Sequence, residues 1–194
     1  MNLRSDLRQI ADWIAPESRV LDLGCGDGAL LAHLRETKSC RGYGVDIDDD
    51  NVLAATTNGV SVLQADLESG LRMFGDRCFD TVVLSQTLQA MRRIEDILRD
   101  MARVAHQGIV SFPNFGHWRC ALSLALGRMP VTPEIPYDWH DTPNIHLCTL
   151  KDFEILAARL ALRITDRVVM AAGRPVSVLP RLRATLAVYR FNTH

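Results

Sequence analysis

Apolar and polar positions along this chain repeat with two different periods, which indicates that strands and helices follow one another. Short apolar or alternating runs at residues 20–23, 60–66 and 78–84 are typical of strands. Between them, stretches such as 29–34 and 94–104 carry apolar residues three or four positions apart, as in helices packed on one face. Repeated strand–helix units predict an α/β class, with a doubly wound and mostly parallel sheet.

The same pattern extends over the rest of the chain. A helical stripe within residues 2–14 ends before Pro16. Further strands are expected at 41–48, 108–112, 162–170 and 184–191. The last of these runs could lie antiparallel to its neighbours. Because no repeat or linker divides the pattern, we expect a single domain over residues 1–194.

The regular pattern stops between residues 113 and 148. Several prolines interrupt it and leave room for one short apolar helix at 117–126. Such a long irregular segment in a compact domain is usually a lid, a binding loop or a partner-contacting element. It contains Trp118, Tyr137 and Trp139, residue types that are enriched at interfaces. The alternative is a loop whose aromatic side chains cover the edge of the sheet.

The candidate chemistry begins at the glycine-rich turn that follows the first predicted strand. Glycines at positions 24, 26 and 28 let the backbone approach a ligand closely, with N–H groups of the helix start facing it. This spacing also fits the dinucleotide fingerprint, so an NAD-dependent oxidoreductase is one alternative. However, Asp22 and Asp27 would repel a pyrophosphate and attract an ammonium or sulfonium group. The charges therefore favour S-adenosylmethionine.

Two further carboxylates follow predicted strands. Asp46 lies about twenty residues beyond Gly24, where this architecture places the carboxylate that binds ribose hydroxyls. Its place at a strand end predicts little contribution to the core. Asp66 ends the third predicted strand. Because the carboxyl ends of parallel strands converge, we expect Asp22, Asp46 and Asp66 to line one crevice.

Composition narrows the possible partners and the compartment. The formal net charge of -1 over 194 residues provides no electrostatic footprint for nucleic acid or an anionic membrane. No apolar run is long enough to cross a bilayer, and no apolar signal core is evident near residue 1. Five scattered cysteines without a C-x-x-C pair favour reduced thiols. We therefore expect a cytoplasmic protein.

Two other kinds of site have little support in the sequence. His140, Asp141 and His146 lie close together but lack a firm ligand spacing, so no metal site is expected. Ser111, His117 and Asp141 could be assembled into a catalytic triad, but the chain has no G-x-S-x-G elbow. Neither arrangement explains the glycine-rich turn.

Four longer motifs carry a resemblance to a known family. They are VLDLGCGDG (20–28), SQTLQ (85–89), SFPNFGHW (111–118) and WHDTPNIH (139–146). With them the chain resembles the MetW family of bacterial methionine-biosynthesis proteins over nearly its whole length. The first motif is shared with class I S-adenosylmethionine-dependent methyltransferases at large. The resemblance implies a seven-stranded, Rossmann-like methyltransferase sheet and a role beside homoserine O-acyltransferase.

The resemblance also implies roles for individual residues toward S-adenosylmethionine or S-adenosylhomocysteine. Gly24 and Gly26 would approach the methionine end, Asp22 its ammonium, Asp46 the ribose, Asp66 the adenine amine, and Ser85 the methionine moiety. Methyl transfer itself is not firmly assigned to the family. After the fourth predicted strand stands Ser85-Gln86-Thr87 instead of the Asn/Asp-Pro-Pro-Tyr of amino-group methylases, and no general base is evident. Proximity alone can drive methyl transfer to a good nucleophile, so catalysis stays open.

These inferences lead to one function and one alternative. The first is an S-adenosylmethionine-binding accessory or regulatory subunit that supports homoserine O-acyltransferase. The alternative is a methyltransferase acting on a small molecule that the 113–148 segment covers.

Overall fold

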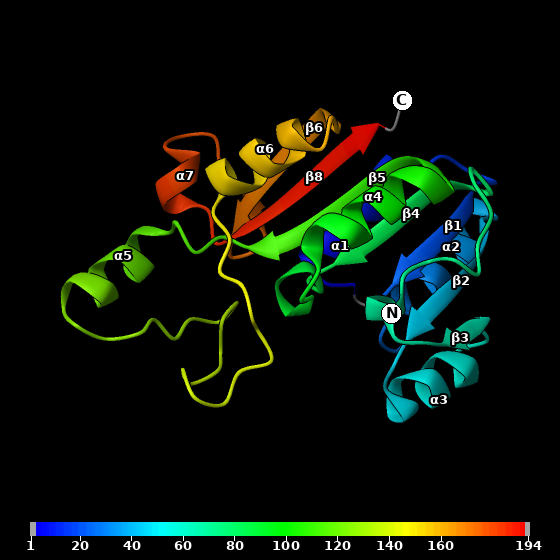
Figure 1. The fold of residues 1–194 in the computed structure, drawn as a ribbon, viewed down its shortest axis with the longest axis horizontal. Coiled ribbons are helices and arrows are strands. Elements are labelled where there is room, and N and C mark those ends of the chain that lie inside the picture. Colours follow the sequence, from blue (N-terminus) through cyan, green and yellow to red (C-terminus); the bar gives the residue numbers. More distant parts are fainter. Residues whose placement is uncertain (1–2, 193–194) are drawn as a thin grey trace.

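A computed structural model describes residues 3–192 as a twisted sheet with helices on both faces (Figure 1). The strands are β1 (Arg19–Leu23), β2 (Arg41–Asp46), β3 (Val62–Gln64), β4 (Phe79–Ser85), β5 (Ala105–Pro113), β6 (Arg163–Ala171), β7 (Arg174–Pro175) and β8 (Leu186–Asn192). Their order across the sheet is β3-β2-β1-β4-β5-β8-β6-β7. Strands β1 to β5 are parallel, while β8 runs antiparallel to β5 and β6. The doubly wound, mostly parallel sheet is confirmed, as is the antiparallel last strand.

The sheet has eight strands instead of the seven that the resemblance implies. The additional strand, β7, has only two residues and pairs with the end of β6. Ala172 and Gly173 join them, both with positive φ (48° and 73°). Two such residues form the tight turn that fits a two-residue hairpin. The eighth strand is therefore a short hairpin extension at the edge, and the parallel core is as expected.

Helices cover the two faces of the sheet. They are α1 (Ser5–Trp13), α2 (Ala29–Lys38), α3 (Asp49–Thr57), α4 (Ile94–Val104), α5 (Trp118–Ala125), α6 (Leu150–Arg159) and α7 (Pro180–Arg183), with the 3-10 turns η1 (Leu67–Ser69) and η2 (Leu88–Ala90). Buried side chains of α1, α2 and α3 share one core, and those of α4 and α6 share the other. On β4, Val83 joins the first core while Val82 and Leu84 join the second. This alternation is the two-residue period of a strand buried on both faces.

Strand β3 is shorter than the alternating run at 60–66 predicts. It includes only Val62–Gln64, at the edge of the sheet where one side lacks a partner strand. Asp66 lies two residues beyond the end of β3 and begins η1 instead. An edge strand gains hydrogen bonds from one neighbour only, so pairing ends sooner than in a central strand. This shift moves Asp66 away from the strand end where the sequence placed it.

The irregular segment at 113–148 leaves the carboxyl end of β5 and extends beyond the sheet (Figure 1). Its one helix is α5, as the sequence predicts. The backbone N–H groups of Ile145 and His146 both donate to the carbonyl of Gln89, at 2.8 and 3.0 Å. The segment is thereby tied to η2, next to the end of β4. None of the helices within residues 3–192 combines the length and apolarity that a bilayer crossing requires.

Candidate functional site

The glycine-rich loop connects β1 to α2 in a conformation that favours glycine. Gly24, Gly26 and Gly28 have φ values of +68°, +55° and +73°. A Cβ atom at Gly24 would lie 2.5 Å from the hydroxyl oxygen of Thr87, whereas one at Gly26 would meet nothing within 4 Å. Both positions thus need glycine for their backbone angle. Gly24 also needs it for packing, while Gly26 faces open space that a ligand can use.

Several backbone donors of this loop are used inside the protein. The N–H groups of Gly24 and Cys25 donate to the carbonyl of Val45 on β2, at 2.7 and 3.1 Å. The N–H of Gly26 donates to Asp46, and that of Ala29 to Asp27. The N–H groups of Leu30 and Leu31, in the first turn of α2, form no hydrogen bond within residues 3–192. That N–H groups of the helix start face a ligand therefore stays a prediction.

Asp22, the penultimate residue of β1, has a buried carboxylate whose hydrogen-bonding capacity is not fully used. Its residue is 3% exposed, and its Oδ1 atom has no hydrogen-bond partner among the described residues. Burial raises its pKa to about 7, Arg4 opposes that shift, and the negative charges of Asp46 and Asp6 add to it. A cation placed beside Asp22 would supply what the protein lacks.

Asp46, the last residue of β2, is also buried and binds the loop. One carboxylate oxygen accepts from the N–H of Gly26 at 2.8 Å. The other accepts from the N–H of Asp48 at 3.1 Å and from the side-chain amide of Asn51 at 3.3 Å. Asp46 therefore stabilises the loop, a role that the expectation of little contribution to the core did not include. Each carboxylate oxygen can accept two hydrogen bonds, so capacity for a ligand hydroxyl remains at Oδ2.

Asp66 is exposed, and neither Asp66 nor Asp46 is among the residues that line the cavity beside Asp22. Its carboxylate accepts from the N–H of Glu68 at 2.9 Å and so caps η1. The prediction that Asp66 ends the third strand is therefore wrong, because β3 ends at Gln64, while a crevice shared by the three acids stays a prediction. A role for Asp66 toward an adenine amine stays a prediction.

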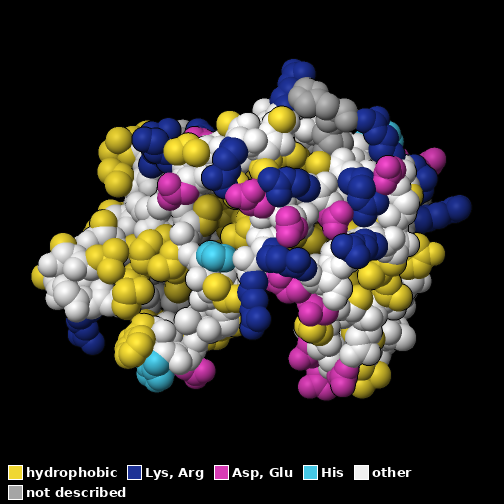
Figure 2. Space-filling view, in the orientation of Figure 1, with side chains coloured by type: hydrophobic (Ala, Val, Ile, Leu, Met, Phe, Trp, Pro, Cys, Tyr) yellow, Lys and Arg dark blue, Asp and Glu magenta, His cyan; other side chains and the backbone are white. Residues whose placement is uncertain are grey.

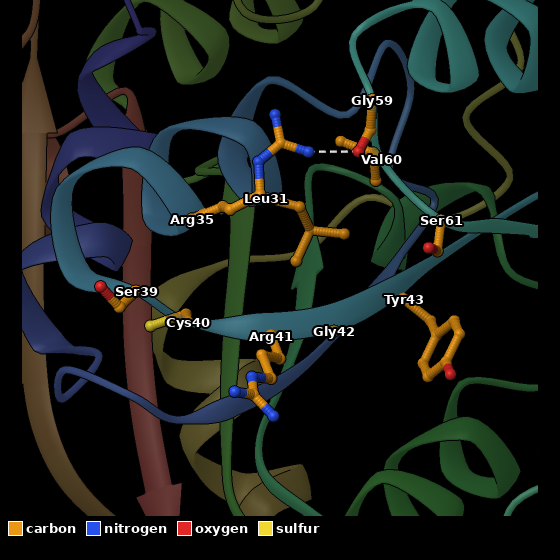
Figure 3. A pocket seen from close by; sticks show the side chains of 10 residues that line it. All are labelled: Leu31, Arg35, Ser39, Cys40, Arg41, Gly42, Tyr43, Gly59, Val60 and Ser61. Atoms are coloured by element: carbon orange, nitrogen blue, oxygen red, sulfur yellow. Dashed lines mark hydrogen bonds between the residues drawn. The ribbon is translucent and has the colours of Figure 1, made fainter.

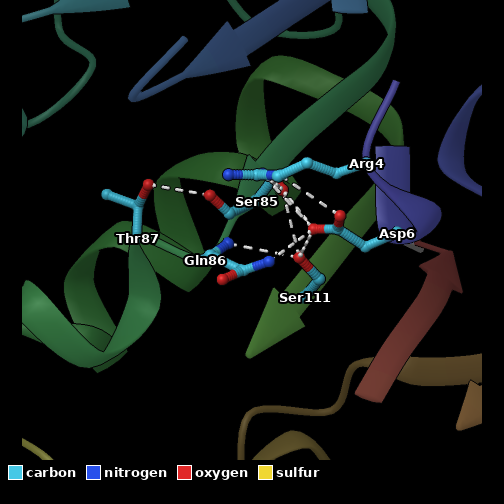
Figure 4. A network of polar contacts seen from close by, with 6 residues as sticks. All are labelled: Arg4, Asp6, Ser85, Gln86, Thr87 and Ser111. Carbon is cyan, nitrogen blue, oxygen red and sulfur yellow. Dashed lines mark hydrogen bonds and ion pairs between the residues drawn. The ribbon is translucent and has the colours of Figure 1, made fainter. Parts of the chain in front are cut away.

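A second polar cluster, which the sequence analysis did not single out, lies where α1 meets the ends of β4 and β5 (Figure 4). Asp6 of α1 is 1% exposed. Its Oδ2 accepts from Ser85 at 3.0 Å, from Ser111 at 3.2 Å and from the side-chain amide of Gln86 at 2.9 Å. Arg4 contacts both Asp6, at 3.3 Å, and Ser85, at 3.0 Å. The cluster fixes α1 against the sheet.

The signal for this cluster is present in the sequence. Asp6 lies three residues after Leu3 and four before Ile10, so helical spacing places it on the apolar face of its helix. A carboxylate there is buried on folding and requires partners. The helical periodicity indicates that Asp6 is buried, but only the structure shows which side chains donate hydrogen bonds to it.

One cavity of about 290 Å³ brings the loop, Asp22 and α1 together. Four of the six predicted site residues line it: Asp22, Gly24, Gly26 and Ser85. The other lining residues are Leu3, Arg4, Leu7, Cys25, Asp27, Ala29 and Leu30. Burial raises the pKa of the Cys25 thiol to about 12, so it stays protonated near neutral pH. The cavity thus offers a buried carboxylate and open backbone beside a protonated thiol.

A larger hollow of about 600 Å³ lies against α2 and the amino-terminal part of β2 (Figure 3). It is therefore at the end of this strand opposite to Asp46. Arg35 crosses it and donates to the carbonyls of Gly59 and Asn58. Its charged lining residues are Arg35 and Arg41, without a carboxylate among the described residues around it. It therefore lacks the acidic group that an ammonium or sulfonium ligand needs.

Two of the three residues considered for a triad, Ser111 and His117, are engaged elsewhere. Ser111 donates to Asp6 within the α1 cluster. His117 caps α5, with its Nδ1 accepting from the N–H of Arg119 at 3.3 Å. Within residues 3–192, His, Cys, Asp and Glu side chains do not gather in a group of three that could hold a metal ion. All five cysteines are free thiols.

The fold and this site define a class of protein: an α/β, Rossmann-like domain of the S-adenosylmethionine-dependent methyltransferase fold. Solved structures with the same architecture include a chain of the complex between the Haloferax volcanii Trm112 methyltransferase activator and the putative methyltransferase, with a TM-score of 0.73 at 15% identity. That match covers 98% of this chain and 90% of the other. An S-adenosylmethionine-dependent methyltransferase from Archaeoglobus fulgidus matches with a TM-score of 0.72 at 15% identity, over 96% of this chain and 91% of the other.

The sequence comparisons identify the family. A family model described as methionine biosynthesis protein MetW matches residues 4–191. The bifunctional methionine biosynthesis protein MetXA/MetW of Rhodopirellula baltica is 35% identical over 206 residues, covering 99% of this chain. The chain belongs to the MetW family of methionine biosynthesis proteins. It spans 33% of the length of that bifunctional relative.

Proposed function

We propose that this chain binds S-adenosylmethionine, or its product S-adenosylhomocysteine, as an accessory and regulatory subunit of homoserine O-acyltransferase in the cytoplasm. The observation that carries the ligand part is Asp22, a buried carboxylate with an oxygen that lacks a partner among the described residues and lines a cavity. Such a group is costly unless a cation binds beside it. The ammonium of the ligand's methionine moiety is a cation of the right kind.

The other residues around the cavity suit the remaining parts of this ligand. Gly26 leaves open space where a side chain would stand, and Ser85 borders the same cavity. Asp46 anchors the neighbouring loop and retains acceptor capacity for a ribose hydroxyl. When bound, S-adenosylmethionine supplies an electrophilic methyl group on its sulfonium. The protein's part is to bind and orient it.

The partner proposal rests on the bifunctional relative. Its name joins MetXA and MetW in one protein, and this chain matches 33% of its length. Fusing two proteins holds them at high effective concentration, which favours pairs that work in contact. From the family resemblance we take the MetXA portion to be the homoserine O-acyltransferase. This chain would then contact a separate copy of that enzyme.

The 113–148 segment provides an apolar surface for such a contact. Trp118 is 47% and Trp139 74% exposed, so these rings do not simply cover the sheet edge. Other exposed apolar side chains of the segment are Leu122, Leu124, Leu126, Met129, Val131, Tyr137, Ile145 and Leu147. Figure 2 shows hydrophobic side chains gathered over the part of the molecule that carries α5, whereas charged residues mix across the opposite part. We call these residues the insert surface. Exposed apolar area of this kind marks interaction sites.

A chain of hydrogen bonds connects the cavity to the insert surface and supports a regulatory role. Gln86 donates to Asp6 in the α1 cluster at 2.9 Å. Gln89 donates to the carbonyl of Gln86 at 2.7 Å, and its own carbonyl accepts from Ile145 and His146. A ligand that shifts the α1 cluster would therefore bias the insert. The size of the effect is limited by the ligand's preference for one arrangement.

A methyltransferase acting on a small molecule is the second candidate. A cavity of about 420 Å³ lies between α5, the insert and the ends of β6 and β8. Glu134, which lines it, has a buried carboxylate oxygen without a hydrogen-bond partner in the described part of the chain. Burial, together with the charge of Arg119, lowers the pKa of His117 in the same wall. Because Nδ1 of this neutral imidazole accepts from the N–H of Arg119, its Nε2 carries the proton, so the unpartnered oxygen of Glu134 is the group that would accept a proton from a bound substrate.

Calorimetry with S-adenosylmethionine, S-adenosylhomocysteine and NAD tests the ligand proposal. We expect the first two to bind and NAD not to bind, because the carboxylates of Asp22 and Asp27 that line the cavity would repel a pyrophosphate. Binding of NAD alone would overturn the proposal. A methyl-release assay over candidate acceptors, run on the same protein, separates the second candidate from the first.

The partner proposal is tested with purified homoserine O-acyltransferase. We expect co-purification, and we expect the ligand to change the affinity between the two proteins. Linkage then requires that saturating acyltransferase changes the ligand affinity by the same factor, ordinarily about 5- to 150-fold. Equal ligand affinities with and without the enzyme would exclude regulation through the association of the two proteins.

A further inference from the structure

Helix α1 forms one wall of the ligand cavity. Leu3 and Arg4, which directly precede α1, and Leu7 within it line the same cavity as Asp22 and Gly26. The cavity is therefore incomplete without a segment that precedes the first strand. This segment brings in the one cationic side chain among the lining residues, Arg4.

The guanidinium of Arg4 is held in position by contacts with two neighbouring side chains, those of Asp6 and Ser85. Its Nε lies 3.3 Å from Oδ1 of Asp6, and its Nη2 donates to the hydroxyl of Ser85 at 3.0 Å (Figure 4). Asp6 is itself held by Ser85, Ser111 and Gln86. A guanidinium anchored at two points loses little further entropy when it binds a third group.

Arg4 still has hydrogen-bonding capacity toward the cavity. Its hydrogen bonds to other residues within 3–192 use Nη2, and its side chain is 55% exposed. The Nη1 donors are left for another acceptor. Guanidinium groups bind carboxylates well, since several N–H donors lie in one plane.

The cavity thus presents one cation and one unpartnered anion. Arg4, the residue that precedes α1, and Asp22 of β1 carry charges of opposite sign and line a single space. An α-amino-acid head group carries a carboxylate and an ammonium on one carbon and is complementary to both. Because this inference rests on the proposed ligand, it concerns which part of that ligand is recognised.

We propose that Arg4 binds the α-carboxylate of the ligand while Asp22 faces its ammonium, so that the cavity selects molecules with a complete amino-acid head group. S-adenosylmethionine and S-adenosylhomocysteine have this group. Decarboxylated S-adenosylmethionine retains the ammonium and the sulfonium but lacks the carboxylate. Discrimination between these two sulfonium compounds reports on Arg4 specifically.

The experiment measures the affinity of the full chain for S-adenosylmethionine and for its decarboxylated form by calorimetry. We expect the wild type to bind S-adenosylmethionine roughly 10- to 100-fold more tightly, the usual effect of a hydrogen bond between charged groups. In Arg4→Gln that ratio should fall close to one, mainly through weaker binding of S-adenosylmethionine. Arg8→Gln removes the same charge from an exposed position on α1 outside the cavity, and it should keep the wild-type ratio.

A second variant covers the possibility that Arg4→Gln destabilises α1 by leaving Asp6 without its cation. The double variant Arg4→Gln/Asp6→Asn removes both charges together, and its ratio should also be close to one. If the double variant or a folded Arg4→Gln variant keeps the wild-type preference, Arg4 does not bind the carboxylate. If the wild type binds both compounds equally, head-group selection is overturned while the proposed ligand stands. Binding of neither compound by the wild type overturns both.

Discussion

The cavity lined by Asp22, Gly26 and Arg4 differs from the insert surface in the kind of group that it presents. The first presents buried polar groups and the second presents exposed apolar side chains. Around the cavity, buried polar groups are held by hydrogen bonds, and Asp22 is an exception with an unpartnered oxygen. On the insert surface, large apolar side chains such as Trp118 and Trp139 are exposed. Buried charge recognises a small charged ligand, whereas apolar area favours a protein partner. The two regions should therefore respond to different mutations.

The largest expected effect is at the open glycine of the loop. In Gly26→Val, a branched side chain would occupy the space next to the cavity and resist the positive φ of 55°. We expect ligand affinity to fall more than about 100-fold, equivalent to roughly 3 kcal/mol. Calorimetry measures this loss, and acyltransferase co-purification should persist. Near-native ligand affinity in this variant would show that the loop does not face the ligand.

The next effect concerns the charge of Asp22 and depends on pH. Its folded pKa of about 7 lies above the unfolded value of 3.8, so folding favours the neutral acid. The associated stability is fully present below pH 3.8 and is lost as the pH rises through about 7. Asp22→Asn removes this penalty, so it should unfold at higher temperature than the wild type at pH 8 and similarly at pH 4.

Thermal scans with and without ligand measure both consequences of this substitution. At pH 8 the variant should be more stable by roughly 1–3 kcal/mol, since one pKa unit corresponds to about 1.4 kcal/mol. Saturating S-adenosylmethionine should stabilise the wild type and scarcely affect Asp22→Asn. A wild-type protein that is more stable than Asp22→Asn at pH 8 without ligand would contradict the assignment.

Substitutions on the insert surface should weaken partner binding and leave ligand binding unchanged. The double variant Trp118→Ala/Trp139→Ala removes two exposed rings, and aromatic anchors at interfaces are often worth about 2 kcal/mol or more. We expect roughly 30-fold weaker binding to homoserine O-acyltransferase, with ligand affinity within about 3-fold of wild type. Tyr43→Ala, an exposed aromatic on β2 away from the insert, serves as the control. Unchanged acyltransferase affinity would assign the partner to another face.

Asp46→Ala should have the smallest effect on ligand binding, about tenfold, because the ribose contact is one of several. It should also destabilise the protein, since Gly26 and Asp48 lose an acceptor. Asp48→Ala is a useful comparison, as it removes a helix cap from α3 without touching the loop. Lower stability in both variants, with weaker ligand binding in Asp46→Ala only, separates the two roles of this carboxylate. Wild-type ligand affinity in Asp46→Ala would exclude the ribose contact.

Much of the site could be predicted because its residues are local in sequence. Asp22 and the three glycines lie within seven positions, and the strand before them marks the turn. The role of Asp46 in holding the loop could not be predicted, because it depends on β2 pairing beside β1 in a particular register. Asp66 was misplaced for a related reason, since β3 lies at the edge and ends early.

The sequence by itself determined the strand and helix alternation, the glycine-rich turn, the irregular segment and the family. These features follow from periodicity, backbone angles and motifs, which act over a few residues. Only the tertiary structure decided that α1 contributes to the cavity and that Arg4 and Asp22 line the same space. It also decided that Asp46 accepts from the N–H of Gly26 and that Gln89 connects the cluster to the insert. Such contacts join residues far apart in the chain, and they form only when the sheet brings the carboxyl ends of its strands together.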